Sequence, residues 1–450
     1  MIKENKKNKE AGPLSDSNGI AVKQISVLKQ ELVSGGYDRV LCSLYGCEMT
    51  DVLHYRNRCL QVLKGFEETF ADRGHGEVML VSSPGRLELT GNHCDHQGGT
   101  VLTGTVNLDI LACVAANVTD TVNVTSKGFE PFSIKCSDTD MRTDEKNTSA
   151  ALVRGMIKAI EDKGFKAGGF DMYAVSDVAG GLGMSSSACF EVLVGTVFNI
   201  LFCDGQLSRE EIAYAGMFAE NEYFGKPCGL MDQMACISGG INCFDFSDAG
   251  KPVVYNIDFD LKEAVLDIVV TDTGTDHAGM AEEFSAIPGE MFAVANAFGK
   301  KKLCEVEEEC FYRELPRLRD LVGDRALMRA MHWYDEVKRV KSQREALEAG
   351  DADTFTELAG KSGRSSFMYL QNIDTYKRPE YEPVALSLAV AEHVLQGKGV
   401  VRIQGGGFAG SIIAFVQNDH TEEYISEMER MLGNGACRRV GIRSEGVYVI

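Results

Sequence analysis

The segment Gly180-Gly181-Leu182-Gly183-Met184-Ser185-Ser186-Ser187-Ala188 decides how the middle of this chain folds. It lies between an apolar, strand-like run at residues 170–178 and an apolar helix candidate at residues 189–202. Glycines let a backbone turn tightly and bring its N–H groups close to an anion, because no Cβ stands in the way. The serines fall where the helix begins, beside free N–H donors and the positive end of the helix dipole. This order predicts a phosphate cradle, with a plain serine-capped helix after a flexible turn as the alternative.

Bulk composition sets the class of protein. The 450 residues, of which 44% are hydrophobic, are enough for two or three domains with real cores. A net charge of -20 argues against a nucleic-acid partner, because neutralising a phosphate backbone takes clustered Lys and Arg. Nucleotide binding stays open, since a few backbone amides, one metal ion and one or two cations suffice for it.

We expect a cytoplasmic protein without a membrane partner. Residues 1–19 are polar and Lys-rich with no apolar core, which predicts a disordered tail and not a signal peptide. No apolar run approaches the length of a membrane span. The 14 cysteines, without a signal sequence, indicate reduced thiols, and their spacing argues against structural zinc. The oligomeric state does not follow from the sequence.

Hydrophobic periodicity predicts an α+β fold. Residues 20 to about 75 are helical in pattern, with Leu60, Leu63, Phe66 and Phe70 at the spacing of a core-facing stripe. Strands and helices then alternate without a regular βαβ period, which favours α+β over a doubly wound sheet. A soft boundary falls near residue 260. We expect strands at 78–82, 100–117, 121–125, 264–271 and within 400–416, and helices at 148–163, 208–224 and 288–349.

Two glycine-containing segments imitate nucleotide motifs. Residues 405–410 satisfy G-x-G-x-x-G, yet a dinucleotide fingerprint requires a helix to follow, and residues 411–416 have the pattern of a strand. Gly360-Lys361-Ser362 looks like the end of a P-loop, but Phe355 stands where its first glycine must be. Neither segment therefore predicts a nucleotide site.

Three further segments carry residue types suited to a ligand. Residues 83–99 pack Arg, Asn, His and Asp into a glycine-bounded loop, which suits a polyhydroxylated ligand, although a polar surface turn would look the same. Residues 219–233 place Asp232 in an apolar Gly-Leu-Met setting, where a carboxylate is costly unless it is paired or functional. In residues 402–410 the glycines allow close approach of the backbone to a second loop or a ligand.

Together the four segments resemble the motifs of the GHMP kinases (galacto-, homoserine, mevalonate and phosphomevalonate kinases), most closely those of the galactokinase family. Residues 85–99 resemble G-R-V-N-L-I-G-E-H-T-D-Y-N-G-G, and the cradle resembles P-x-G-x-G-L-S-S-S-A. Residues 219–233 resemble A-E-N-E-F-x-G-x-x-C-G-I-M-D-Q, and residues 403–410 resemble M-T-G-G-G-F-G-G. The likeness runs from about residue 60 to the C-terminus and leaves the helical segment before it uncovered.

The resemblance implies the two-domain GHMP kinase fold, with the active site in the cleft between the domains. Its N-terminal domain is similar to domain 2 of ribosomal protein S5, and its C-terminal domain is ferredoxin-like. On this chain we expect a disordered tail at 1–19, an N-terminal domain with a helical extension at 20–260, and a C-terminal domain at 261–450.

The resemblance also implies ATP and Mg²⁺. Ser187 and Glu220 match the family's Mg²⁺ ligands, and a hard cation with oxygen ligands is what bridging phosphates require. The residues matched to the loop that holds the ATP phosphates are Gly181, Gly183, Met184, Ser185, Ser186, Ser187 and Ala188.

For the sugar, the resemblance implies a catalytic pair and several contacts. Asp232 matches the aspartate that accepts the proton of the anomeric hydroxyl, and Arg86 matches the arginine that keeps this carboxylate ionised. His93 and Asp95 match residues that contact sugar hydroxyls. Phosphoryl transfer has a loose transition state, so positioning and electrostatics do most of the work.

The chain departs from the family at the sugar end. Asn92 stands where galactokinases carry a Glu that binds distal hydroxyls, and Phe284 stands about where they carry a sugar-contacting Tyr. Asn92 and Phe284 are therefore the substrate-contacting positions most open to doubt, because an amide donates and accepts whereas a carboxylate only accepts. His96 replaces a Tyr, Gln404 replaces a Thr, and Ile287-Pro288 replaces an Arg pair.

We therefore expect an ATP-dependent kinase that phosphorylates the C1 hydroxyl of galactose or a close relative, giving a sugar 1-phosphate and ADP. One alternative is the same chemistry on another sugar, such as an amino sugar, a uronic acid or a pentose. The other is a non-catalytic sensor of sugar and ATP, which the intact cradle disfavours.

Overall fold

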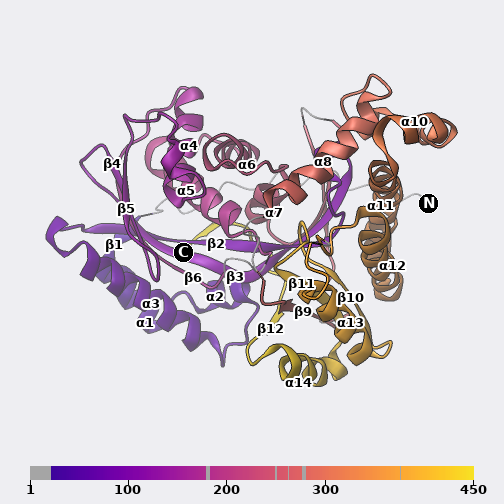
Figure 1. Cartoon of the computed structure of the whole chain (residues 1–450). Helices are drawn as coiled ribbons and strands as arrows, with labels where there is room; N and C mark the ends of the chain where they lie inside the picture. Colours follow the sequence, from indigo (N-terminus) through magenta and orange to yellow (C-terminus); the bar gives the residue numbers. More distant parts are fainter. Residues whose placement is uncertain (1–21, 179–182, 249–250, 262, 276–279, 376) are drawn as a thin grey trace, which may run out of the picture.

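The computed structural model describes residues 22–178, 183–248, 251–261, 263–275, 280–375 and 377–450 (Figure 1). The predicted tail at 1–19 and the predicted cradle residue Gly181 lie outside the described residues. No helix in the described part of the chain is both long enough and apolar enough to cross a membrane.

A large mixed sheet organises the first half of the chain. Its central hairpin pairs β2 (Glu77–Thr90) with β3 (Thr100–Ala116) in antiparallel register. The pairing of β4 with β6 is parallel, and the other pairings in this sheet are antiparallel. The remaining strands are β1 (Lys23–Gln24), β4 (Thr121–Ser126), β5 (Phe132–Lys135), β6 (Phe170–Ser176), β7 (Ile241–Asp245), β8 (Val253–Ile257) and β13 (Tyr448–Val449).

Helices cover both faces of this sheet, because its strands are apolar on both sides (Figure 1). Val78 and Leu80 of β2 pack in one core with α1 (Ile25–Ser34), α2 (Asp38–Tyr45) and α3 (Val52–Thr69). The alternate residues of β2, Met79 and Val81, belong to the larger core on the other face. That face carries α4 (Ser149–Asp162), α5 (Ser186–Phe202), α6 (Arg209–Phe218) and α7 (Met231–Ser238).

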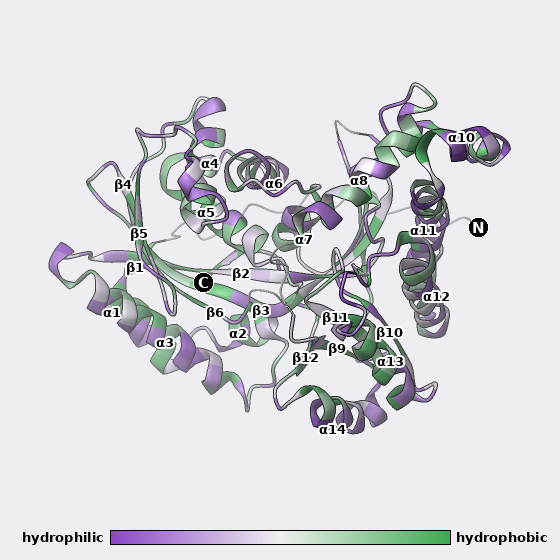
Figure 2. Ribbon diagram, viewed as in Figure 1, coloured by the Kyte–Doolittle hydropathy of each residue, from purple (hydrophilic) through white to green (hydrophobic). Residues whose placement is uncertain are grey.

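The helical pattern predicted before residue 75 is confirmed. Leu63, Phe66 and Phe70 are buried in the core between α3 and the sheet, while Leu60 packs against that core and is only partly buried. The hydropathy colouring places hydrophilic residues on the side of α3 that faces away from the sheet (Figure 2). The stripe is therefore a packing face, as its spacing indicates.

A second, antiparallel sheet has the strand order β10-β11-β9-β12. Val269 of β9 packs toward α13 (Pro383–Leu395) and α14 (Thr421–Leu432), whereas its neighbours Ile268 and Val270 join the larger core. This period of two leaves one face to α13 and α14 and the other to α11 and α12. The strands are β9 (Leu266–Asp272), β10 (Gly399–Ile403), β11 (Ser411–Gln417) and β12 (Cys437–Val440), and the helices α11 (Asp324–Glu348) and α12 (Ala352–Ser365).

Three elements differ most from the sequence prediction. The predicted helical stretch at 288–349 begins earlier, with α8 (Ala281–Asn296), and is broken into α8, α9 (Glu308–Arg313), α10 (Leu315–Val322) and α11. The helix predicted over 208–224 has its capping box at Ser208 but changes to a π-helix over Ala219–Phe224. Strand β2 runs on to Thr90, far beyond the predicted 78–82, because its later polar residues are buried and paired instead of ending the strand.

The last residues of the chain return to the first sheet. Strand β13 pairs with β2, and Arg443 reaches into the core with Nη1 2.7 Å from Ser82 Oγ. Asp109 of β3 lies between Arg443 and Arg58, whose Nη1 is 2.5 Å from Asp109 Oδ1. All of these groups except Arg58, which is 8% exposed, are fully buried. The division at residue 260 stays a prediction, since both sheets share one continuous core.

We predict that Asp109→Asn destabilises the fold by roughly 3–5 kcal/mol, because it leaves buried guanidinium groups without their counter-charge. Burial raises the pKa of Asp109, but Arg58 and Arg443 outweigh burial and hold it below its usual value. The contribution of this carboxylate is thus present above the unfolded pKa of about 3.9 and is lost as the pH falls through the folded pKa.

Urea unfolding of wild type and of Asp109→Asn at neutral pH measures the difference in the free energy of unfolding. The matched control is Asp324→Asn, which removes the partner of Arg319 in an exposed, solvent-screened pair and should leave the stability nearly unchanged. Equal stability of Asp109→Asn and the control would contradict the prediction.

Candidate active site

The hydroxyl cluster begins α5 but does not cap it in the ordinary way. Ser185 is the N-cap residue in a left-handed conformation, with φ 54°, and its side chain makes no capping hydrogen bond. Its Oγ instead donates to Asp232 Oδ2. Gly183 also has a positive φ, of 64°, and lies against Gln404 of the second half. The plain serine-capped helix therefore does not describe this segment.

Arg86 joins the turn before α5 to the start of α7. Its Nε and Nη2 lie 2.8 Å and 2.7 Å from Asp232 Oδ1, and its Nη1 donates to the carbonyl of Gly183. The backbone N–H of Arg86 donates to the carbonyl of Met184 at 3.2 Å. A single side chain thereby fixes three segments that are far apart in the sequence.

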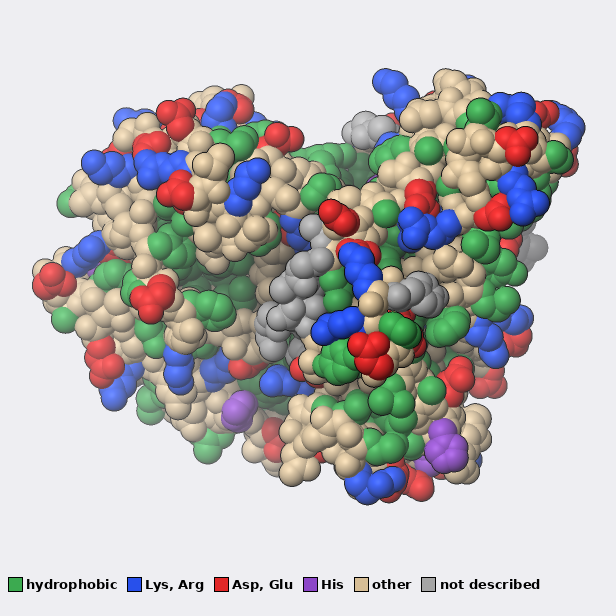
Figure 3. Space-filling view, in the orientation of Figure 1, with side chains coloured by type: hydrophobic (Ala, Val, Ile, Leu, Met, Phe, Trp, Pro, Cys, Tyr) green, Lys and Arg blue, Asp and Glu red, His purple; other side chains and the backbone are tan. Residues whose placement is uncertain are grey.

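Asp232 is held as a carboxylate. Burial alone would raise its pKa, but the Arg86 guanidinium and then the Lys226 ammonium outweigh burial, and the pKa of Asp232 lies below its usual value. The side chain stays 15% exposed, so a ligand can reach it. The surface of the molecule is hollowed between the lobe that carries α4 and α6 and the lobe that carries α8 and α10 (Figure 3).

Glu220 is the second buried carboxylate of the site. Its Oε1 accepts hydrogen bonds from Ser187 Oγ at 2.8 Å and from Lys226 Nζ at 3.0 Å. Its Oε2 accepts from Gln233 Nε2 at 2.9 Å, and the same amide reaches Glu191 Oε2 at 2.9 Å. Burial, and next the neighbouring Glu220, raise the pKa of Glu191 well above its usual value.

Sequence reasoning missed Lys226, Gln233 and Glu191. Lys226 and Gln233 lie inside the motif at residues 219–233 but were assigned no role there. Glu191 could have been identified from the sequence, because it is a lone carboxylate in the otherwise apolar run of α5.

His93 and Asp95 lie in the turn after β2. His93 has φ 56° and its Nε2 is 2.9 Å from the carbonyl of Gly406, while burial and then His96 lower its pKa to about 3. The ring is therefore neutral and donates through Nε2. Asp95 packs against Gly229, and burial together with Asp232 raises its pKa. Contact of His93 and Asp95 with a sugar stays a prediction.

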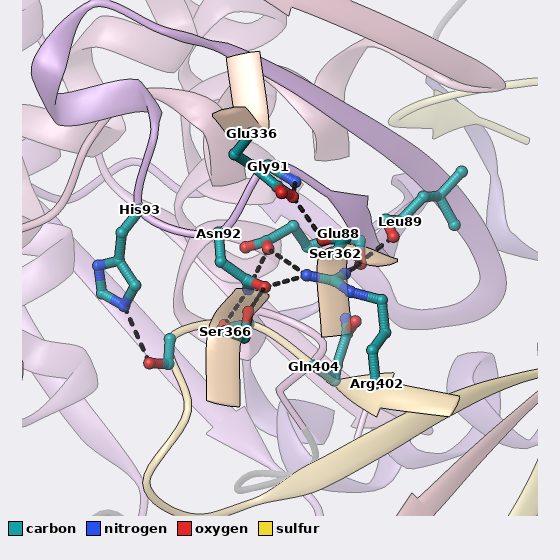
Figure 4. A network of polar contacts seen from close by, with 12 residues as sticks. Glu88, Leu89, Gly91, Asn92, His93, Glu336, Ser362, Ser366, Arg402 and Gln404 are labelled. Atoms are coloured by element: carbon teal, nitrogen blue, oxygen red, sulfur yellow. Dashed lines mark hydrogen bonds and ion pairs between the residues drawn. The ribbon is translucent and has the colours of Figure 1, made fainter. Parts of the chain in front are cut away.

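Asn92 lies in a buried polar network beneath this turn (Figure 4). Its Nδ2 donates to Glu88 Oε1 and, at 2.7 Å, to the carbonyl of Gly405. Its Oδ1 accepts from Arg402 Nη2 and, at 3.0 Å, from Ser366 Oγ. An amide has two donors and two acceptor positions, so all four are used inside the protein. Asn92 is fully buried, and its contact with the sugar stays a prediction.

Phe284 lies in the first turns of α8, on the other side of the glycine-rich loop. Its ring packs edge-on against Phe408, with 5.5 Å between the ring centroids. A Cβ at Gly406 would lie 2.5 Å from the Phe284 ring, so only glycine fits there. Contact of Phe284 with the sugar stays a prediction.

This fold and site define a kinase of the GHMP class. The model for the N-terminal domain of GHMP kinases matches residues 151–240, and the galactokinase galactose-binding signature matches residues 64–116. Galactokinase from Clostridium tetani is 30% identical over 393 residues, which cover 84% of this chain and 95% of that protein. The chain belongs to the galactokinase family, and it is accordingly an enzyme that uses ATP as a substrate.

Other relatives and solved structures agree. Galactokinase from Mannheimia succiniciproducens is 28% identical over 380 residues, covering 82% of this chain and 92% of that protein. The structure of Lactococcus lactis galactokinase complexed with galactose matches with a TM-score of 0.72 at 23% identity, over 86% of this chain and 98% of that one. Mevalonate kinase from Methanococcus jannaschii matches with a TM-score of 0.57 at 13% identity, over 82% and 99% of the two chains. The predicted α+β, two-domain GHMP kinase fold is confirmed.

We predict that Gly229→Ala weakens sugar binding by at least ~10-fold while the protein stays folded. An added Cβ at Gly229 would lie 1.8 Å from Asp95 Oδ2, so this carboxylate must move, and displacements of about 1 Å in an active site can cost ~10²-fold. The KM for the sugar and the melting temperature measure the two effects. Gly289→Ala is the control, because nothing lies within 4 Å of its added Cβ. An unchanged KM in Gly229→Ala would show that Asp95 does not need its present position.

Proposed function

We propose that this protein transfers the γ-phosphate of ATP to the C1 hydroxyl of galactose or a closely related sugar, giving the sugar 1-phosphate and ADP. The observation that carries the proposal is the Asp232 carboxylate, kept ionised by Arg86 at the start of the phosphate cradle. The relatives named galactokinase support galactose as the sugar.

Asp232 serves as the group that takes the proton of the attacking hydroxyl. A carboxylate with a lowered pKa is a weak base, but in a loose transition state this proton leaves late and orientation matters more than basicity. Ser185 fixes one carboxylate oxygen and Arg86 fixes the other, so the base is oriented before the substrates bind. Arg86 also places a positive charge where negative charge develops.

The start of α5 holds the phosphates. Free N–H groups and the positive end of the helix dipole lie there, and the positive φ of Gly183 and Ser185 turns the backbone into that position. Met184 lies between these two residues, and Ser186, Ser187 and Ala188 form the first turn of α5; we assign the cradle to these residues.

The residues present fit a Mg²⁺ ion bound mainly through the nucleotide. Ser187 Oγ and Glu220 Oε1 lie 2.8 Å apart, and the described residues contain no cluster of three or more His, Cys, Asp or Glu that could hold a metal by themselves. Mg²⁺ is usually bound by one or two protein oxygens together with phosphates and water. When bound, the ion would neutralise charge on the phosphates, and Ser187 and Glu220 would hold it.

The same chemistry on another sugar is the second candidate, because the departures gather at the sugar end. Asn92 and Phe284 replace residues that contact the sugar in the family, whereas Arg86, Asp232, Ser187 and Glu220 are retained. The oriented carboxylate disfavours the non-catalytic sensor. We place the protein in the cytoplasm as a further proposal, since every described cysteine is a free thiol.

We predict that Asp232→Asn lowers kcat by at least ~10²-fold, the range for a lost general base. ADP release in a coupled assay, run across hexoses, amino sugars and uronic acids, measures the loss and ranks the sugars. Asp258→Asn, at an exposed aspartate, is the control and should keep full activity. Full activity of Asp232→Asn would remove the proposed function.

We predict that Lys226→Met binds Mg²⁺ about tenfold more tightly without nucleotide, a difference of ~1.4 kcal/mol. The Lys226 ammonium occupies the same Glu220 oxygen that Ser187 faces, so a cation on Glu220 must displace it. Calorimetric titration with MgCl₂ measures the affinity. Lys158→Met, at a surface pair with Asp162, is the control. Unchanged Mg²⁺ affinity in Lys226→Met would contradict the assignment of Glu220 to the metal.

A further inference from the structure

Glu88 and Asn92 have exchanged places relative to the family motif. The galactokinase signature has Asn at the position of Glu88 and Glu at the position of Asn92. In this structure the two side chains contact each other, with Asn92 Nδ2 donating to Glu88 Oε1 (Figure 4). A carboxylate–amide pair is therefore present, but the carboxylate belongs to the strand and the amide to the turn.

The amide end of the pair has no capacity left for a ligand. Asn92 is fully buried, and its four hydrogen-bonding positions are taken by Glu88, Gly405, Arg402 and Ser366. A sugar hydroxyl could reach it only by breaking one of these bonds, which would leave a buried polar group unpaired.

The carboxylate end does have capacity left. Glu88 uses Oε1 for Asn92, and in the described part of the chain no hydrogen bond reaches its Oε2. Arg402 is the buried counter-charge of Glu88, with its Nη2 3.5 Å from Oε1, so this ion pair also faces Oε1 and leaves Oε2 open. The Arg402 guanidinium also donates to the carbonyls of Glu88 and Leu89 at 3.0 Å and 2.8 Å and to Asn92 Oδ1.

The position of Glu88 on β2 directs its side chain toward the active site. Glu88 follows Arg86 by two residues without a register shift between them, so both side chains lie on the same face of the strand. Arg86 is bound to Asp232. Asp95 and Asp232 are also close enough to affect Glu88: burial, opposed by Arg402 and Arg86 and reinforced by these two aspartates, raises the pKa of Glu88 to about 7.

Building on the proposed function, we propose that Glu88 is the carboxylate that binds a ring hydroxyl of the sugar other than the anomeric one. Asn92 is then a positioning residue, which holds Glu88 through Oε1 and leaves Oε2 to accept the hydroxyl. The exchange keeps a carboxylate in the site but moves it four residues along the chain, so it meets a different part of the sugar than a carboxylate at position 92 would.

The test is a double-mutant cycle, in which one change replaces Glu88 and the other removes one hydroxyl of the sugar. The Kd of wild type and of Glu88→Gln is measured by calorimetry for the sugar that wild type binds most tightly and for each of its monodeoxy derivatives. Glu88→Gln should weaken binding of the parent sugar by ~10- to 100-fold, the range for a hydrogen bond to a charged group. The loss should vanish for one deoxy sugar only, and the KM for ATP should not change. Glu77→Gln, at the exposed start of β2, is the control.

The double variant Glu88→Asn with Asn92→Glu restores the order of the family motif and keeps the charge and the pairing. It should fold, and its coupling should move to a different hydroxyl. The inference is wrong if Glu88→Gln weakens the binding of every deoxy sugar as much as that of the parent sugar. If Glu88→Gln does not fold, wild type and the double variant are compared instead. The inference is then wrong if removal of the same hydroxyl costs both proteins the most affinity. Absence of sugar turnover by wild type would instead remove the proposed function, while the binding cycle would still decide the role of Glu88.

Discussion

The ion pair between Arg86 and Asp232 is the interaction on which the rest of the site depends. It joins the middle of β2 to the first turn of α7, and the third nitrogen of Arg86 reaches the turn before α5. Both groups are largely out of water, where an unpaired charge would be very costly, so neither can be removed without disturbing the other. The same ion pair that lets β2 be a buried strand also keeps the Asp232 carboxylate ionised beside the start of α5. Folding and chemistry thus share one contact.

Buried charge in this protein is matched locally, and each matching ties distant parts of the chain together. Asp109 holds Arg58 of the N-terminal helices and Arg443 near the C-terminus. Arg402 of β10 lies on the carbonyls of Glu88 and Leu89 in β2. Such pairs contribute little net stability compared with apolar packing, but they allow only one arrangement of the segments they join. Because these buried groups need their partners, the two sheets are fixed relative to each other.

Much of the fold and part of the site could be predicted from the sequence, for reasons that the residues make plain. The start of α5 within the serine cluster and the capping box at Ser208 are local signals, and both are where the pattern predicts. The continuation of β2 to Thr90 could not be predicted, because a run with Arg86 and Glu88 forms a buried strand only when partners from α7 and β10 are present. For the same reason the hydrogen bonds of Asn92 to Ser366 and Arg402 could not be predicted, since they join residues 274 and 310 positions apart.

The two ends of the site are built from different parts of the chain. This difference explains why the sugar end departs from the family motifs while the phosphate end keeps them. The proposed phosphate end is formed within the first half, by Ser185, Ser187, Glu220 and Asp232 held on α5, the π-helix and α7. The proposed sugar end contacts the second half, because His93 donates to Gly406 and Asn92 bonds to Gly405 and Ser366. A substitution in the turn after β2 must therefore be accommodated by a loop that is distant in sequence. An exchange within one contacting pair, as between Glu88 and Asn92, meets this constraint more easily than a single change, because it keeps both the charge and the hydrogen bond.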